Sequence, residues 1–141
     1  MNLLRCFTPK SEVVYLYDTY TLRQAMEKME QQRYTGLPML NAEHRYVGTV
    51  TEGDLLWFCK AHNFSSIKDA EKISIREVPL HVHTKSVPVN TRAETLFDAL
   101  LCSNFVPVED DRGYFIGIVT RKRFMENMKA EDLWSDMQLS S

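Results

Sequence analysis

Long apolar runs, paired cysteines and an excess of one charge are all absent from this 141-residue sequence. No apolar stretch approaches the length of about 20 residues that crosses a bilayer, and the first residues lack the apolar segment of a secretory signal peptide. The three cysteines, Cys6, Cys59 and Cys102, are odd in number and far apart. A disulfide-stapled secreted domain is therefore not expected. The pattern is typical of a protein in a reducing cytoplasm without a membrane anchor.

The charge balance gives no strong field of either sign. Lysine and arginine number 17 against 19 aspartates and glutamates, for a formal net charge of −2. A general attraction for nucleic acid is therefore not expected, and any anion site must be local. With 44% hydrophobic and 26% charged residues, the composition is typical of a folded globular chain. The length suits one compact body or two small halves that share a core.

An internal repeat is the strongest pattern in the sequence. Residues 37–41 (LPMLN) recur as residues 106–110 (VPVED), 69 positions later. At the same offset, residues 46–51 (YVGTVT) recur as residues 115–120 (FIGIVT). A chance match would not normally keep its register over two strands and the turn between them. The chain is therefore expected to contain two copies of one structural unit.

Each copy predicts the element order β-α-β-β-α, and so an α+β fold. A short β-rich run is followed by an amphipathic helix, by two apolar strands joined by a polar turn, and by a second helix that begins after Thr51 or Thr120. The expected organisation is residues 1–62 as the first repeat, 63–72 as a linker, 73–130 as the second repeat and 131–141 as a C-terminal tail.

The duplicated pattern resembles the CBS domain family in its tandem form. Residues 37–41 look like the family's apolar-proline strand, and residues 48–55 (GTVTEGDL) look like its Gly-x-Val-Ser/Thr-x-x-Asp-Leu signature. Residues 104–111 and 117–121 are similar to small stand-alone bacterial two-CBS proteins, some of which sense cyclic di-AMP. The resemblance implies a pseudo-two-fold pair of repeats with an adenine nucleotide in the cleft between them. It also implies a regulatory role rather than catalysis, and often a homodimer.

The start of the helix after Thr51 is a candidate nucleotide site. Backbone N–H groups in a first helical turn lack helical acceptors, and the helix dipole attracts anions there. Thr51 and Asp54 have the spacing of a capping box, which by itself gives both residues a structural role. With the resemblance, we expect the Thr51 hydroxyl to donate to a phosphate oxygen and the Asp54 carboxylate to accept from ribose hydroxyls.

The corresponding turn of the second copy carries three cations, Arg121, Lys122 and Arg123, directly after Thr120. Each cation at the positive end of a helix costs roughly 0.3–1 kcal/mol when nothing compensates it. A bound phosphate would turn this cost into attraction, although a solvated surface also tolerates such a run. Arg123 stands where the first copy has Asp54, and an arginine accepts no hydrogen bond from ribose. This turn is therefore expected to hold phosphate more than ribose.

An adenine ring needs an apolar slot with backbone hydrogen-bonding groups at its edge. For each single candidate, an ordinary core position is the alternative interpretation. The candidates are Tyr15, Thr35, Gly36, Leu37 and Pro38 in the first copy, and Val87, Phe105, Val106 and Pro107 in the second.

The sequence therefore predicts a regulatory module that binds an adenine nucleotide and signals to an unidentified effector protein, with AMP or cyclic di-AMP favoured over ATP. The alternative is an interaction scaffold with a vestigial nucleotide site. Catalysis is not expected, because no third group orients Cys59 and His62. A metal site is not expected either, because His81 and His83 have no further ligand motif beside them. Apolar helix faces over residues 22–32 and 54–61 predict a homodimer.

Overall fold

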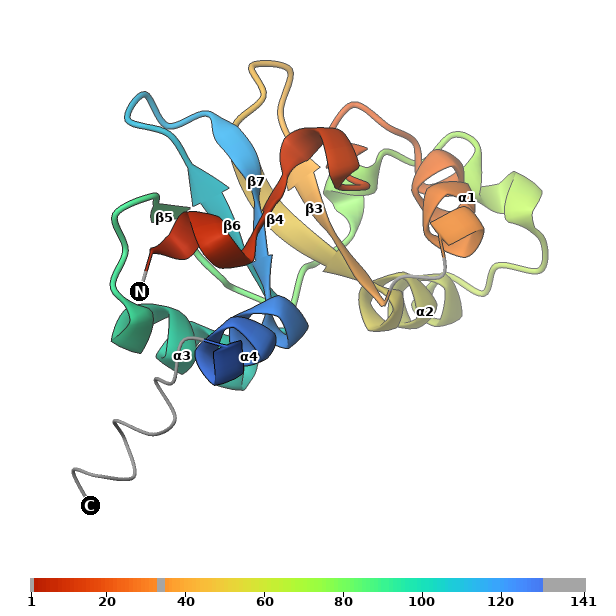
Figure 1. The fold of residues 1–141 in the computed structure, drawn as a ribbon. Helices are drawn as coiled ribbons and strands as arrows, with labels where there is room; N and C mark the ends of the chain where they lie inside the picture. The colour runs from red at the N-terminus through yellow and green to blue at the C-terminus, as the bar shows by residue number, and fades with distance from the viewer. Residues whose placement is uncertain (1, 33–34, 131–141) are drawn as a thin grey trace. The chain divides into compact units, whose positions relative to one another are not determined.

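The chain forms two compact units, which are described separately. The structure is a computed structural model that describes residues 2–32 and 35–130 (Figure 1). One unit is Val14–Thr84, and the other combines Met1–Val13 with Lys85–Ser141. These units are divided differently from the boundaries expected from the repeats, because the N-terminal residues join the C-terminal unit. The tail at 131–141 lies outside the described residues, and the two-fold relation between the repeats stays a prediction.

The unit Val14–Thr84 is built on a sheet with the strand order β2-β3-β4. The strands β2 and β3 are parallel, whereas β3 and β4 form an antiparallel hairpin. In chain order its elements are β2 (Leu16–Tyr17), α1 (Leu22–Gln32), β3 (Gly36–Leu40), β4 (Tyr46–Thr51), α2 (Glu52–Ala61), η3 (Ile67–Ala70) and η4 (Ile75–Glu77). The core forms where the apolar positions of α1, Leu22, Ala25 and Met29, meet the buried strand residues Leu37 and Val50.

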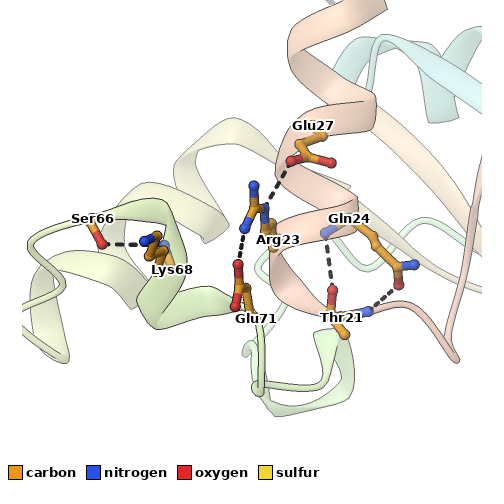
Figure 2. A network of polar contacts seen from close by, with 7 residues as sticks. All are labelled: Thr21, Arg23, Gln24, Glu27, Ser66, Lys68 and Glu71. Carbon is orange, nitrogen blue, oxygen red and sulfur yellow. Dashed lines mark hydrogen bonds and ion pairs between the residues drawn. The ribbon is translucent and has the colours of Figure 1, made fainter.

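The predicted linker at residues 63–72 is folded onto this unit. It contains η3, whose Ala70 is only 1% exposed and belongs to the core. Figure 2 shows Arg23 of α1 between Glu27 on its own helix and Glu71, which follows η3. At the start of α1, the N–H of Thr21 donates to Gln24 Oε1 at 2.8 Å, and the N–H of Gln24 donates to Thr21 Oγ1 at 3.1 Å. The contact of Arg23 with Glu71 ties α1 to the segment after η3, whereas the other contacts are local to α1.

The second unit repeats the same plan and adds a strand from the N-terminus. Its sheet has the order β1-β7-β6-β5. In chain order its elements are η1 (Leu3–Cys6), β1 (Phe7–Pro9), η2 (Lys10–Glu12), β5 (Val87–Pro88), α3 (Ala93–Cys102), β6 (Phe105–Glu109), β7 (Phe115–Thr120) and α4 (Arg121–Ala130). The core is formed by Leu96 and Leu100 of α3, Val106 and Val119 of the sheet, and Phe124 of α4.

The two hairpins agree in atomic detail, which confirms the duplication and the predicted β-α-β-β-α order. In the first, Asn41 Oδ1 accepts from the N–H groups of Glu43 and Arg45 at 2.9 and 3.0 Å. In the second, Asp110 Oδ1 accepts from the residues two and four positions later, each at 2.9 Å. His44 and the equivalent Gly113 both have positive φ, 61° and 85°. An Asn or Asp side chain at the first position of such a turn supports this backbone shape.

The N-terminal strand β1 was not expected from the sequence. It pairs antiparallel with β7, with Phe7 opposite Val119 and Pro9 opposite Gly117. Gly117 has φ 156°, and a Cβ there would lie 2.5 Å from the Phe7 ring. The glycine thus lets β1 lie directly against β7.

Candidate functional site

The start of α2 has the capping geometry that the sequence predicts. The N–H of Asp54 donates to Thr51 Oγ1 at 3.2 Å, and the N–H of Thr51 donates to Asp54 Oδ2 at 3.0 Å. This reciprocal pair is a complete capping box. Asp54 is therefore held rigidly at the junction of β4 and α2, and one of its two carboxylate oxygens already serves the backbone.

The start of α4 repeats part of this geometry in the other unit. The N–H of Arg123 donates to Thr120 Oγ1 at 3.2 Å, as that of Asp54 does to Thr51. The first residue of each helix also donates its N–H to the residue before the proline strand: Glu52 to the carbonyl of Thr35 and Arg121 to that of Asn104, each at 2.9 Å. Each helix start is thus fixed by its own hairpin. The two differ where Arg123 replaces the carboxylate of Asp54.

The carboxylate of Asp54 is not open to solvent. Its side chain is 0% exposed, and its second oxygen, Oδ1, lies 2.5 Å from the ring Nδ1 of His81. The N–H of His81 donates to the same oxygen at 3.2 Å. The expected ribose acceptor is therefore already paired within the unit. His81 could not be predicted as this partner from the sequence, because the two residues are 27 positions apart and His81 lies in a segment without periodicity.

A cavity of about 330 Å³ lies beside this contact. Its walls combine aromatic rings with the Asp54–His81 pair at one side, which suits a small ligand that has an aromatic ring and polar groups. The lining residues are Asp54, Trp57, Phe58, Ala61, His62, Glu77, Pro79 and His81. Of the residues expected to bind ligand, this cavity includes Asp54.

Two of the three cations at the start of α4 bind carbonyl groups of their own unit. The Arg121 guanidinium donates from Nε to the carbonyl of Leu100 at 2.7 Å and from a terminal nitrogen to that of Ser103 at 3.2 Å. These carbonyls lie at the C-terminal end of α3, where a cation is favourable. Arg123 donates to the carbonyl of Phe7 at 3.1 Å and to Thr8 Oγ1 at 3.2 Å. Arg121 is therefore explained by α3 without a bound anion, whereas Lys122 is exposed.

The expected adenine slot consists partly of core residues. Leu37 and Val106 are buried in the cores of their units, and Pro38, Phe105 and Pro107 are buried as well. Thr35 is exposed, and Gly36 and Val87 are half-buried. The half-buried Tyr15 ring contacts Tyr17 edge to face at 5.5 Å, and a hydrogen bond with Tyr17 raises the pKa of Tyr15. In the described structure the side chains of Leu37 and Val106 therefore face the core.

The possible metal site and the Cys59–His62 pair were the weaker candidates from the sequence. In residues 2–32 and 35–130, no group of three or more His, Cys, Asp or Glu is placed to hold a metal ion. His62 donates from Nδ1 to the carbonyl of Phe58 at 2.9 Å and stacks on the Phe58 ring. Burial raises the pKa of the Cys59 thiol, which lowers its thiolate fraction. The described helices include none that is long and apolar enough to span a bilayer.

Comparison with known proteins agrees with the duplicated fold. Residues 5–60 match the family model of the CBS domain. The first repeat is therefore similar to the CBS domain. The match covers nearly all of the first repeat. It begins at residue 5 within η1, and so it includes β1, which pairs with β7 of the other unit.

Solved CBS-domain structures share the fold over nearly the whole chain. A CBS domain protein from Streptococcus pneumoniae TIGR4 is 26% identical, with 89% of this chain and 84% of that one covered and a TM-score of 0.79. CbpB in complex with c-di-AMP is 20% identical, with 100% and 91% covered and a TM-score of 0.79. CBSX2 in complex with AMP is 22% identical, with 90% and 95% covered and a TM-score of 0.72. The expected α+β tandem architecture is therefore confirmed.

Proposed function

We propose that this protein is a regulatory module of the CBS type that binds an adenine nucleotide, with AMP or cyclic di-AMP favoured over ATP, and that it signals the presence of the nucleotide to an effector protein. The observation that carries the proposal is the duplicated helix start. Thr51 and Thr120 each end a strand and accept a hydrogen bond from the third residue of the following helix. CbpB and CBSX2, which share this fold, are described in complex with c-di-AMP and AMP.

The two helix starts suggest a division of roles between phosphate and ribose. The first turn of α4 has no acidic residue and carries the exposed Lys122 beside Arg123. A triphosphate would bring more negative charge than this one basic turn offsets, so a monophosphate or a cyclic dinucleotide suits it better. Asp54 at the start of α2 is the candidate partner for ribose hydroxyls.

A second candidate function is an interaction scaffold whose nucleotide site is vestigial. The pairing of Asp54 with His81 and of Arg121 with the α3 carbonyls favours it, because neither side chain then needs a ligand. The scaffold would leave the protein without measurable affinity for any adenine nucleotide, and this separates the two functions.

The test removes charge from the first turn of α4 and leaves Arg121 to cap α3. The double variant Lys122→Ala/Arg123→Ala should bind AMP and cyclic di-AMP at least about tenfold more weakly, since charge-assisted contacts to an anion are each worth about 1.5–3 kcal/mol. Lys129→Ala removes a cation from the last turn of the same helix and should change affinity by less than about twofold.

Affinity measured by calorimetry at two salt concentrations completes the test, because raising salt should weaken the parent more than the double variant. Far-UV circular dichroism checks that the double variant is folded, since Arg123 also contacts Phe7 and Thr8. A folded double variant that binds both nucleotides as tightly as the parent would show that the phosphate assignment is wrong.

The proposal also includes a cytoplasmic location and a homodimeric state. The cysteines Cys6, Cys59 and Cys102 form no disulfide, which suits a reducing cytoplasm. A homodimer is proposed from the exposed apolar residues Leu56 and Trp57 of α2, which lie 62% and 57% exposed. The effector protein would then recognise the shape of the occupied dimer.

A further inference from the structure

We infer that residues 79–84 form an internal strap that occupies the ribose acceptor, so that a nucleotide and His81 compete for the carboxylate of Asp54. This inference rests on the proposed function, because it concerns the regulation of the same site. It follows from the number of hydrogen bonds that Asp54 already makes. Oδ2 accepts from Thr51, and Oδ1 accepts from the N–H of His81 and lies within hydrogen-bond distance of the His81 ring.

Because Asp54 is buried, His81 and a nucleotide cannot both bind its carboxylate. Its side chain is 0% exposed, so a ribose hydroxyl cannot reach either carboxylate oxygen while the strap is in place. A buried carboxylate is costly without partners, and Thr51 and His81 supply those partners here. Ligand binding through Asp54 therefore requires His81 to leave.

The strap contacts the rest of its unit at Leu80, His81 and Thr84, and it belongs to no strand or helix. Leu80 lies over Gly48, where a Cβ would come within 2.7 Å of Leu80 Cδ1. The Tyr46 hydroxyl donates to the carbonyl of Thr84 at 2.9 Å. Between these points, residues 79–84 have no regular secondary structure. The middle point, His81, can therefore detach while Leu80 and Thr84 keep the strap on its unit.

The exposure of His81 makes its contact with Asp54 weak enough to break. The His81 side chain is 69% exposed, so water can replace the ring as it leaves, and a typical hydrogen bond then has a net worth of only about 0.5–1.5 kcal/mol. The ring also forms one wall of the 330 Å³ cavity beside Asp54. Movement of the ring would uncover the carboxylate toward this cavity, which Asp54 already lines together with Trp57 and Phe58.

The test compares His81→Ala with His83→Ala, which removes an exposed ring of the same type two residues along the strap. AMP and cyclic di-AMP are titrated into each variant and into the parent by calorimetry. His81→Ala removes the ring contact and keeps the backbone N–H donor, so it should bind about twofold to fivefold more tightly, the factor that corresponds to a ring contact of up to about 1 kcal/mol. His83→Ala should bind like the parent. Unchanged or weaker binding by His81→Ala overturns the inference while leaving nucleotide binding intact.

Amide hydrogen exchange gives a second readout that does not depend on a variant. Saturating AMP should speed exchange at the N–H of His81, which loses Asp54 as acceptor, and leave exchange at Glu77 of η4 unchanged. Slower or unchanged exchange at His81 in the saturated protein contradicts a competing strap. If neither the parent nor the variants bind any adenine nucleotide, the proposed function fails, and the inference fails with it.

Discussion

The substitution Gly117→Ala tests how the N-terminal strand is held on its unit. An added Cβ would lie 2.5 Å from ring carbons of Phe7 and closer still to the carbonyl oxygen of Thr8. The backbone φ of 156° is also one that residues with a side chain rarely adopt. Overpacking and backbone strain each cost about 1–3 kcal/mol. We expect a total loss of about 2–6 kcal/mol in the free energy of unfolding.

The equivalent glycine of the first repeat provides a graded comparison. A Cβ at Gly48 would meet Leu80 Cδ1 at 2.7 Å, but this is the end of a flexible side chain, which moves more easily than the backbone of β1. A Cβ at Gly36 would meet its nearest atoms at 3.6 Å, an ordinary contact. The expected order of destabilisation is therefore Gly117→Ala, then Gly48→Ala, then Gly36→Ala, with the last changing stability by less than about 1 kcal/mol.

Urea unfolding followed by far-UV circular dichroism measures this order. With a slope of about 2 kcal/mol per molar urea, the midpoint of Gly117→Ala should fall by about 1–3 M relative to the parent. Release of β1 should also deprive the Arg123 guanidinium of its acceptors on Phe7 and Thr8. A Gly117→Ala protein as stable as Gly36→Ala would refute the close packing of β1 against β7.

Two further outcomes follow from exposed side chains on the helices. Leu56→Glu places a charge on the apolar face of α2, so light scattering should show a parent of twice the 16.4 kDa chain mass and a monomeric variant; a monomeric parent contradicts the proposed homodimer. Iodoacetamide at neutral pH should label the exposed Cys102 before Cys59, because burial raises the pKa of the Cys59 thiol and only the thiolate reacts. Raising the pH should speed labelling of Cys59, as followed by peptide mass spectrometry, and equal rates for both thiols at neutral pH would contradict the burial of Cys59.

The repeat made most of the fold predictable. The proline strands, the hairpins and the capping box at Thr51 are local patterns, in which the interacting residues lie within a few positions of one another. The strand β1 could not be predicted, because a three-residue segment carries too little pattern and its partner β7 lies far along the chain.

The candidate site was predictable only in part, for the same physical reason. Their spacing identifies Thr51 and Asp54 as candidates. His81, which pairs with the Asp54 carboxylate, comes from a segment without periodicity. Spacing also placed Arg121 at the positive end of α4, although its long side chain reaches the C-terminal carbonyls of α3. A side chain of this length can leave the charge environment of its own backbone position, and sequence patterns do not show where it goes.

Calorimetric titration of nucleotide-stripped protein tests the central claim most directly. AMP, cyclic di-AMP and ATP are titrated separately, with GMP as the control for a general phosphate attraction. The proposed function predicts saturable binding of AMP or cyclic di-AMP, weaker binding of ATP and no binding of GMP at the same concentration. Absence of heat and of saturation with all three adenine nucleotides would contradict the proposed function and would support the interaction scaffold.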